Sequence, residues 1–402
     1  TELTHDIFAG CDKLTEVVLP ESLTKIGNRV FEGCNSLKEI TIPKNVNECP
    51  GVMATWGPAF EFSSIETVTF EEGTEKVHNA LFANCGSLKQ INLPSTVNTI
   101  GKYAFYNCTG LEKVDLPEGV TSLETSCFAY CGKLNYICIP ATVESSGGAI
   151  SGAAFERCGL ETVEFTGERE EIPSSMFYDC NSLKTVILPS TLKSIGNTAF
   201  YSCDELSEVT FPDGLERIGD GAFSDCYKLA EITIPASVTY LGSEGASGLG
   251  SAFGSSGLTT VHLEDGRTEI PGYAFANCRN LTNINIPATV TSIGNYSFLH
   301  CESLENIELP SGLTSIGMGA FSCTFSLSSI VLPKSVKYGW VVGTGPFEGS
   351  GLKEVTLENG TASIAEGLFM NCNDLTTINI PSSVKIINNY AFYGCSGLTE
   401  AP

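Results

Sequence analysis

A phenylalanine recurs along the whole chain at intervals of 22 or 23 residues, broken by longer intervals of 26 to 30 residues. A fixed period of this kind indicates a repeat architecture, in which each unit packs on its neighbours. The recurring residues are Phe8, Phe31, Phe60, Phe82, Phe105, Phe128, Phe155, Phe177, Phe200, Phe223, Phe253, Phe275, Phe298, Phe321, Phe347, Phe369 and Phe392.

The apolar positions after each phenylalanine predict one short strand per unit. A Val or Ile is followed two residues later by another apolar residue, as at Ile40 and Ile42 or at Val114 and Leu116. This period of two is typical of a strand with one buried face. In most units proline follows, as at Pro43, and ends the strand because it has no N–H for pairing.

The second half of the unit predicts turns. A second apolar pair often precedes a glycine, such as Gly101, Gly196 or Gly294, and we expect a turn with positive φ there. For the phrase Ala-Phe that follows we predict a helical or 3-10 turn. Because a unit this small cannot bury its own apolar side, we expect each phenylalanine to stack on the next one.

The units are grouped in blocks of four, since each long interval is followed by one of 22 residues and then by intervals of 23. The blocks open near residues 60, 155, 253 and 347. Because each coil of a solenoid contacts only its neighbours, we predict one continuous domain over 1–402.

The aligned unit, LxxIxLPxxVxxIGxxAFxxC, resembles the BspA-like class of leucine-rich repeat over essentially the whole chain. The resemblance implies an α/β repeat solenoid, a right-handed leucine-rich-repeat superhelix that is β-rich with short helical or 3-10 turns, here of about 17 coils. It also implies a bacterial or protozoan surface or secreted protein, similar in several cases to adhesins, with no catalytic residue.

Neither end of the chain carries a polar capping repeat, because Thr1 falls within a unit and the last unit stops at Ala401, where the next strand would start. We therefore expect a fragment of a longer secreted precursor.

The charge balance limits the classes of molecule that the chain can bind. The chain has 46 acidic and 22 basic residues and a net charge of -24, which argues against nucleic acid and anionic membranes. No apolar run has the roughly 18 residues that span a bilayer. As the resemblance implies, we expect an extracellular or cell-surface protein that binds an extracellular or surface protein, with a monomer favoured and basic partners left open.

Thirteen of the 17 cysteines occupy one position, three residues after the phenylalanine. Because Ser or Thr replaces Cys there in the other units, we interpret the position as small and buried, and we favour free thiols over disulfide bridges. Cys127, Cys131 and Cys138 are close in sequence, but we expect them to point to different sides and to form no zinc site.

No catalytic constellation is found. His5, His78, His262 and His300 are scattered among units in unrelated positions, and no phosphate loop, HExxH or GxSxG motif occurs. We predict a non-enzymatic protein without a metal or cofactor site.

Two surfaces are candidates for binding a partner. The first is the concave, solvent-facing side of the predicted sheet, made by the residues that flank each core Val or Ile. A solvated sheet face without a ligand is an equal alternative. The candidate residues are Glu39, Gln90, Asn92, Lys113, Asp115, Tyr136, Glu164, Glu208, Glu231, His262, Asn285, Glu308, Glu354 and Asn379.

The second surface is formed by the insertions that open the blocks, which recur at one phase and should emerge along one side. They contain both tryptophans of the chain, although such loops can also merely cover an edge. The candidate residues are Met53, Trp56, Tyr240, Tyr338 and Trp340.

Our first hypothesis is a recognition module that binds a protein through the sheet side, the insertions or both. A passive spacer that presents another domain is the alternative. Glycan binding is weaker, because platforms of several aromatic residues are scarce in this sequence.

Overall fold

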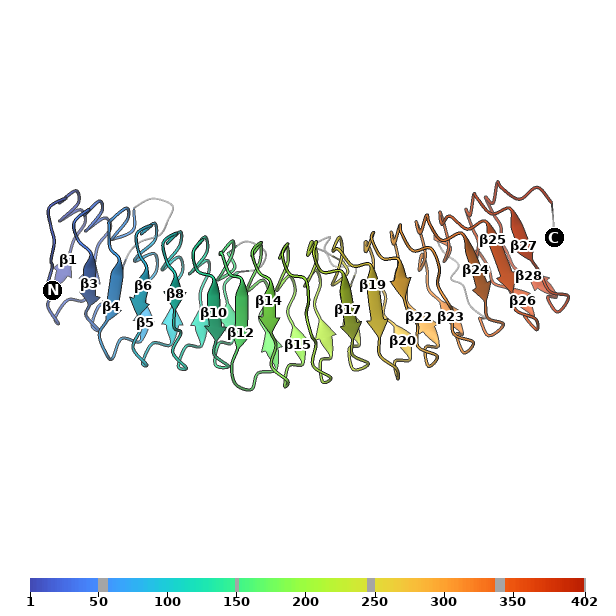
Figure 1. Cartoon of the computed structure of the whole chain (residues 1–402), viewed down its shortest axis with the longest axis horizontal. Coiled ribbons are helices and arrows are strands. Elements are labelled where there is room, and N and C mark those ends of the chain that lie inside the picture. The colour runs from blue at the N-terminus through green and yellow to red at the C-terminus, as the bar shows by residue number, and fades with distance from the viewer. Residues whose placement is uncertain (50–56, 149–151, 244–249, 337–343, 401–402) are drawn as a thin grey trace. The chain divides into compact units, whose positions relative to one another are not determined.

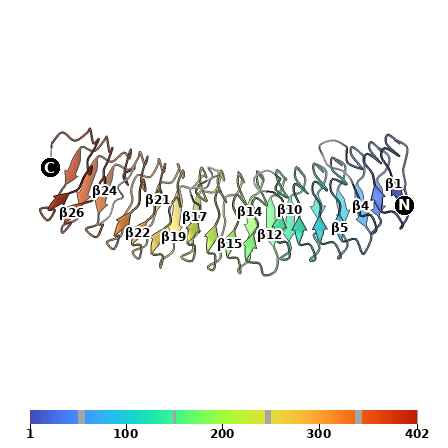
Figure 2. The ribbon, with the colours of Figure 1, turned by 180° about the vertical axis from the view of Figure 1, so that it is seen from behind.

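The structure is a computed structural model that describes residues 1–49, 57–148, 152–243, 250–336 and 344–400. The chain forms two compact units, Thr1–Leu192 with Thr198–Leu206, and Lys193–Asn197 with Ser207–Pro402. Within each unit, consecutive coils lie side by side, as Figures 1 and 2 show from opposite sides. The fold is a parallel β-solenoid of the leucine-rich-repeat type, with about 16 turns in all. One continuous domain over 1–402 stays a prediction.

Two rows of parallel strands run through each unit. The first row of the first unit contains β3 (Glu39–Ile42), β4 (Thr67–Phe70), β6 (Gln90–Asn92), β8 (Lys113–Val114), β10 (Tyr136–Ile139), β12 (Thr162–Phe165) and β14 (Thr185–Ile187). Its second row contains β1 (Glu2–Leu3), β2 (Lys25–Ile26), β5 (Lys76–Val77), β7 (Thr99–Ile100), β9 (Ser122–Leu123), β11 (Ser145–Ser146) and β13 (Glu171–Ile172).

The second unit repeats this plan. Its first row contains β17 (Glu231–Ile234), β19 (Thr260–Leu263), β21 (Asn283–Ile284), β24 (Ser329–Leu332), β25 (Glu354–Leu357) and β27 (Thr377–Asn379). Its second row contains β15 (Ser194–Ile195), β16 (Arg217–Ile218), β18 (Tyr240–Leu241), β20 (Glu269–Ile270), β22 (Ser292–Ile293), β23 (Ser315–Ile316), β26 (Ser363–Ile364) and β28 (Ile386–Ile387).

The first row confirms the predicted strands and their register. In β3 and β4, Ile40 is paired with Val68 and Ile42 with Phe70, and all four side chains are buried. The side chains between them point to the outer side of the sheet, as the period of two along a strand requires. We call the outer side of the first row the sheet face.

The second row was not predicted as strands. Its members are only two residues long, and most end on a core residue such as Ile100 or Leu123, which are paired across β7 and β9. A run of two residues is too short to show a period, so the sequence indicated only an apolar pair followed by a turn.

The predicted helical turns, and with them the α/β class, are wrong for the residues that the structure describes, since these contain no helix. The backbone explains why. Around Phe82, Ala80 has φ 51° and Asn84 has φ 62°, and most coils have such left-handed residues at both positions. A right-handed helix requires negative φ at every residue, so two left-handed residues four positions apart exclude it.

Hydrogen bonds between coils stabilise this turn instead. Ala80, Phe82 and Asn84 donate their N–H groups to carbonyls of the next coil, on Lys102, Ala104 and Tyr106, over 2.8, 2.9 and 2.8 Å. Cys85 donates to the Phe82 carbonyl within the same coil. Every second N–H of the turn therefore joins it to the next coil.

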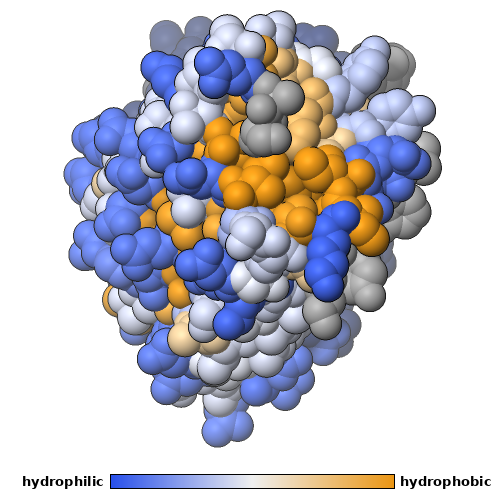
Figure 3. Space-filling model, turned by 90° about the vertical axis from the view of Figure 1, so that its right-hand side faces the viewer, coloured by the Kyte–Doolittle hydropathy of each residue, from blue (hydrophilic) through white to orange (hydrophobic). Residues whose placement is uncertain are grey.

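The predicted phenylalanine stack is confirmed. In the first unit, the centroids of adjacent rings from Phe8 to Phe200 are 4.7 to 5.9 Å apart, and the rings lie nearly parallel. In the second unit the same holds from Phe275 to Phe392, at 5.1 to 5.8 Å. Figure 3 shows the apolar interior at the end of the second unit, surrounded by polar residues.

The repeated cysteine is buried beside this stack and carries a specific hydrogen bond. Cys108 Sγ donates to the Phe82 carbonyl over 3.1 Å, and Cys180 Sγ donates to the Phe155 carbonyl over 3.0 Å. The 17 cysteines are present as thiols. Burial raises the pKa of the thiols of Cys108, Cys180 and Cys301 well above the usual value.

The glycines that follow the second apolar pair serve close packing, and the expectation of positive φ at Gly101, Gly196 and Gly294 is wrong. A Cβ atom at Gly101 would lie 2.7 Å from the Val77 carbonyl oxygen, and one at Gly294 would collide with the backbone of Gly272. Glycine is needed because successive coils approach each other backbone to backbone.

The 22-residue interval after each block opening also has a structural cause. In opening coils, one residue is missing between the position after the cysteine and the following Leu or Ile. The backbone N–H at this shortened point, for example in Gly159, donates to the Cys131 carbonyl of the preceding coil over 3.2 Å. A Cβ atom at Gly159 would collide with the Gly132 carbonyl.

We predict that Gly159→Ala lowers the free energy of unfolding by about 1–3 kcal/mol, the usual cost of overpacking. Gly132→Ala is the matched control, because a Cβ atom there meets no atom within 4 Å. Chemical denaturation of both variants measures the difference. Equal stability of the two variants would contradict the shortened-coil geometry.

A second prediction concerns the cysteine positions. In the folded protein, iodoacetamide should modify the exposed Cys11 rapidly and leave Cys108, Cys180 and Cys301 unmodified, because only an accessible thiolate reacts. Mass spectrometry of peptides locates the label, Cys11→Ser identifies the fast site, and denaturant should expose the remaining thiols. Rapid native labelling of Cys108 would show that the interior is not packed as described.

Candidate functional site

Ten of the fourteen residues predicted for the sheet face lie in strands of the first row, and all fourteen side chains are exposed or half-buried. Strand register brings them into rows within each unit. Glu39 is paired with Thr67, Thr67 with Gln90, and Gln90 with Lys113. In the second unit, Glu354 is paired with Thr377, and Thr356 with Asn379. Their role in binding stays a prediction.

A groove lies on the sheet face of each unit. The groove of the second unit has a volume of about 640 Å³ and that of the first unit about 400 Å³. We call them the acidic grooves. The second-unit groove is lined by Asn306, Glu308, Ser329, Val331, Glu354 and Glu358 among others, and the first-unit groove by Glu16, Val18, Glu39, Thr41, Thr69 and Glu71 among others.

The two acidic grooves occupy the same place in the four-coil block. Glu71 and Glu358 are equivalent residues of two block-opening coils, and Glu16 is equivalent to Asn306. Each groove also contains an exposed valine, Val18 at 85% and Val331 at 56% exposure. The two valines hold the same position in the single coil but lie in different coils of the block, since Val18 is equivalent to Glu308 and Val331 to Thr41.

The acidic turn of the block-opening coils has a structural role. In these coils the usual proline is replaced, and Glu71, Glu264 and Glu358 accept the backbone N–H of Lys44, Ala236 and Lys334 in the preceding coil. The distances are 3.2, 3.1 and 3.1 Å. These glutamates support the edge of the sheet face, whereas Glu308 and Glu354 have no such bond among the described residues.

Two further polar pairs lie on the sheet face. The Tyr136 hydroxyl donates to Glu164 Oε2 over 2.8 Å, and this hydrogen bond is the main cause that raises the pKa of Tyr136 to about 12. In the second unit, His262 Nε2 lies 2.7 Å from Glu231 Oε1.

The insertion side can be assessed at one residue. Met53, Trp56, Tyr338 and Trp340 lie outside the described residues. The Tyr240 hydroxyl donates to Asp220 over 2.6 Å, and the Arg217 guanidinium lies 3.7 Å from the centre of the tyrosine ring. Tyr240 is thus packed onto its own unit, and its part in binding stays a prediction.

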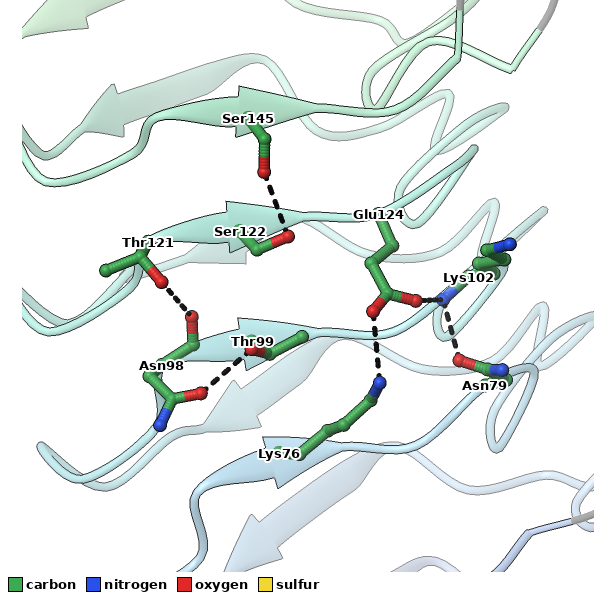
Figure 4. A network of polar contacts seen from close by, with 9 residues as sticks. All are labelled: Lys76, Asn79, Asn98, Thr99, Lys102, Thr121, Ser122, Glu124 and Ser145. Carbon is green, nitrogen blue, oxygen red and sulfur yellow. Dashed lines mark hydrogen bonds and ion pairs between the residues drawn. The ribbon is translucent and has the colours of Figure 1, made fainter.

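The second row of strands carries a polar network that sequence reasoning missed (Figure 4). Glu124 Oε1 lies 3.0 Å from Lys76 Nζ, two coils away, and its other carboxylate oxygen accepts the backbone N–H of Lys102 over 3.2 Å. Asn79 accepts the same N–H over 3.0 Å. Asn197 and Asn295 bind the next coil in the same way, so the recurring phrase Ile-Gly-Asn was the available signal.

The histidines lie in separate surroundings, as expected. His5 Nδ1 accepts the N–H of Asn28, and His78 Nε2 lies 2.9 Å from the Val46 carbonyl. Within the described ranges, no three His, Cys, Asp or Glu residues converge in a way that could hold a metal ion. The same part of the chain has no helix with the length and apolar character needed to cross a membrane.

Stacked coils, two rows of parallel strands and a buried phenylalanine ladder define a leucine-rich-repeat protein. Six copies of the family model described as BspA type leucine rich repeat region match residues 1–51, 57–149, 148–249, 249–339 and 340–401. The chain belongs to this family, as its resemblance predicted. None of the curated protein sequences compared with the chain matches it.

Solved structures are similar to the chain. A leucine-rich repeat protein from Bacteroides ovatus is 25% identical with a TM-score of 0.58, over 99% of this chain and 85% of that one. A leucine rich cell surface protein from Faecalibacterium prausnitzii is 25% identical with a TM-score of 0.43, over 85% of this chain and 87% of that one. The first of these likenesses supports the leucine-rich-repeat fold.

A third prediction follows from the tyrosine pair. Glu164→Gln should lower the pKa of Tyr136 from about 12 toward the ordinary value, because an amide stabilises the protonated phenol less than a carboxylate acceptor does. The difference in ultraviolet absorbance between the variant and the parent protein during alkaline titration measures the shift. In a Tyr136→Phe background the same substitution should produce no difference.

Proposed function

We propose that the chain is a non-enzymatic recognition module that binds a protein partner, and that the acidic grooves of the sheet face receive basic groups of that partner. The observation that carries this proposal is the recurrence of an acidic groove at the same place in two blocks, each with one exposed valine among its lining residues. A fold that needed only a solvated face would not require an exposed apolar residue there.

The electrostatics of the chain favour a cationic partner. The net charge of -24 attracts basic groups over distances of about one Debye length, roughly 8 Å at physiological salt. Within the described part of the chain, Glu308 and Glu354 make no ion pair with a lysine or arginine, so their charges are available to a ligand. Val331 between them supplies an apolar contact for the stem of a lysine or arginine.

We also propose that the protein acts outside the cell or on its surface, in an adhesin-like role, as the family resemblance implies. The insertions that contain Trp56 and Trp340 stay the second candidate surface for the same partner. A spacer that presents another domain is the second candidate, because a regular solenoid can separate two points without binding anything. Glycan binding is a weaker candidate.

A fourth prediction tests the acidic groove of the second unit. The double variant Glu308→Gln and Glu354→Gln should bind immobilised lysine-rich peptides about tenfold more weakly than the parent protein, with a smaller dependence on salt. Its control is Asp265→Asn with Asp374→Asn, which removes the same charge at exposed positions away from the groove. Equal binding by the two double variants would reduce the effect to net charge and contradict a groove site.

The parent protein and both double variants should also be tested for binding to extracellular-matrix proteins, mucins and bacterial surfaces. Once a partner is found, Trp56, Tyr338 and Trp340 should be replaced together by Ala. Unaltered binding would remove the insertions from the proposal, and failure of every surface to bind the isolated repeats would favour the spacer.

A further inference from the structure

A row of large aromatic residues follows the phenylalanine turns of the first unit, on neither of the surfaces considered above. We call it the tyrosine stripe. Its members lie one or two residues from the ladder phenylalanine on five consecutive coils: Tyr103, Tyr106, Tyr130, Arg157, Tyr178 and Tyr201. Their side chains are half-buried or, for Arg157, exposed.

Contacts between its members order the stripe in two groups, one with Tyr130 at its centre and one formed by Tyr178 and Tyr201. The rings of Tyr106 and Tyr130 are 5.2 Å apart and tilted by 60°, and Tyr103 meets Tyr106 edge to face at 5.7 Å. Arg157 donates to the Tyr130 hydroxyl over 2.8 Å. Side chains fixed before binding lose little conformational entropy on binding.

The charge within the stripe is already balanced. The guanidinium of Arg157 lies 5.6 Å from the centre of the Tyr130 ring and forms an ion pair with Asp179. The stripe therefore presents mainly ring edges and hydroxyl groups, which suit a neutral ligand that has apolar rings and hydrogen-bond acceptors.

The fold does not require these aromatic residues. The position after the ladder phenylalanine, held here by Tyr106, Tyr178 and Tyr201, is alanine in other coils, at Ala83 and Ala129 in the same unit. The next position, held by Tyr130, is asparagine at Asn84 and Asn107, with the same left-handed backbone. A role outside coil stacking explains five tyrosines better than packing does.

The spacing between the coils of the stripe matches the repeat of one peptide conformation, the polyproline II helix. Two coils advance by about 9.6 Å, at roughly 4.8 Å per stacked strand, and one turn of polyproline II helix advances by about 9.3 Å. Residues three apart along such a helix would therefore lie over coils two apart, such as those that carry Tyr130 and Tyr178. Its backbone carbonyls have no internal partners, so tyrosine hydroxyls can donate to them, as aromatic grooves for proline-rich segments do.

The ring arrangement is less suited to a sugar. Tyr178 and Tyr201 stack on each other at 4.9 Å with 7° between their planes, so each covers one face of the other. Tyr106 and Tyr130 share no plane. A sugar ring stacks on an open aromatic face, whereas a pyrrolidine ring fits between ridges.

We propose that the tyrosine stripe of the first unit binds a proline-rich segment of a protein partner in the polyproline II conformation. This site is separate from the acidic grooves and does not depend on them. About six residues of such a helix would span the five coils, at roughly 3.1 Å per residue.

The test uses the full chain and a fluorescently labelled decaproline peptide, with binding followed by anisotropy. The triple variant Tyr106→Ala, Tyr178→Ala and Tyr201→Ala should weaken binding at least tenfold. Alanine already occupies this position in other coils, so the variant should fold, and circular dichroism with thermal unfolding checks that it does. Tyr130→Asn, which copies Asn84 and Asn107, is an independent single-site variant and should weaken binding by a smaller factor.

Tyr227→Ala is the control, since Tyr227 is an exposed tyrosine of the second unit that lies outside the stripe. Decaproline binding that is absent, or equal in the triple variant and in this control, would overturn the proposal. Binding of cellohexaose or chitohexaose that depends on the stripe, without decaproline binding, would replace it with a glycan site. The Glu308→Gln and Glu354→Gln variant should bind decaproline normally, which distinguishes this site from the acidic groove.

Discussion

The structure depends on the hydrogen bonds that join each phenylalanine turn to the next coil. In the turn around Phe82, three N–H groups, on Ala80, Phe82 and Asn84, have carbonyl partners on the following coil. The same spacing brings phenylalanine rings into parallel contact. Backbone pairing and ring stacking thus impose one common advance per coil, and each strand row has to follow it.

This common advance explains which features the sequence could predict. The phenylalanine ladder, the buried cysteines and the first strand row, for example Ile40 over Val68, all follow from a period that repeats 17 times. The outward side chains of the sheet face follow from the alternation along each strand. Packing of identical neighbours leaves a clear trace in the sequence because the same side chain is needed in every coil.

Features that arise from backbone geometry were harder to predict from the sequence. Left-handed residues such as Ala80 and Tyr103 give no sign in their side chains, so a helical turn was expected where the structure has none. The glycines after the second apolar pair were assigned to turns, although Gly101 serves close packing between backbones. The acidic grooves and the tyrosine stripe depend on which coils are neighbours, and single residues such as Val331 or Tyr130 showed this only once the coils were stacked.

The shortened coil that opens each block has a consequence for how such a chain can change its length. A Cβ atom at Gly159 would collide with the preceding coil, and in the other three opening coils a glutamate of the next turn also binds the coil before it. Duplication of a single coil beside this junction would place a full-length loop where a short one is needed. Gain or loss of a whole block keeps every junction between coils intact. The protein can therefore change its length in steps of about 95 residues, and each added block extends the sheet face by four coils.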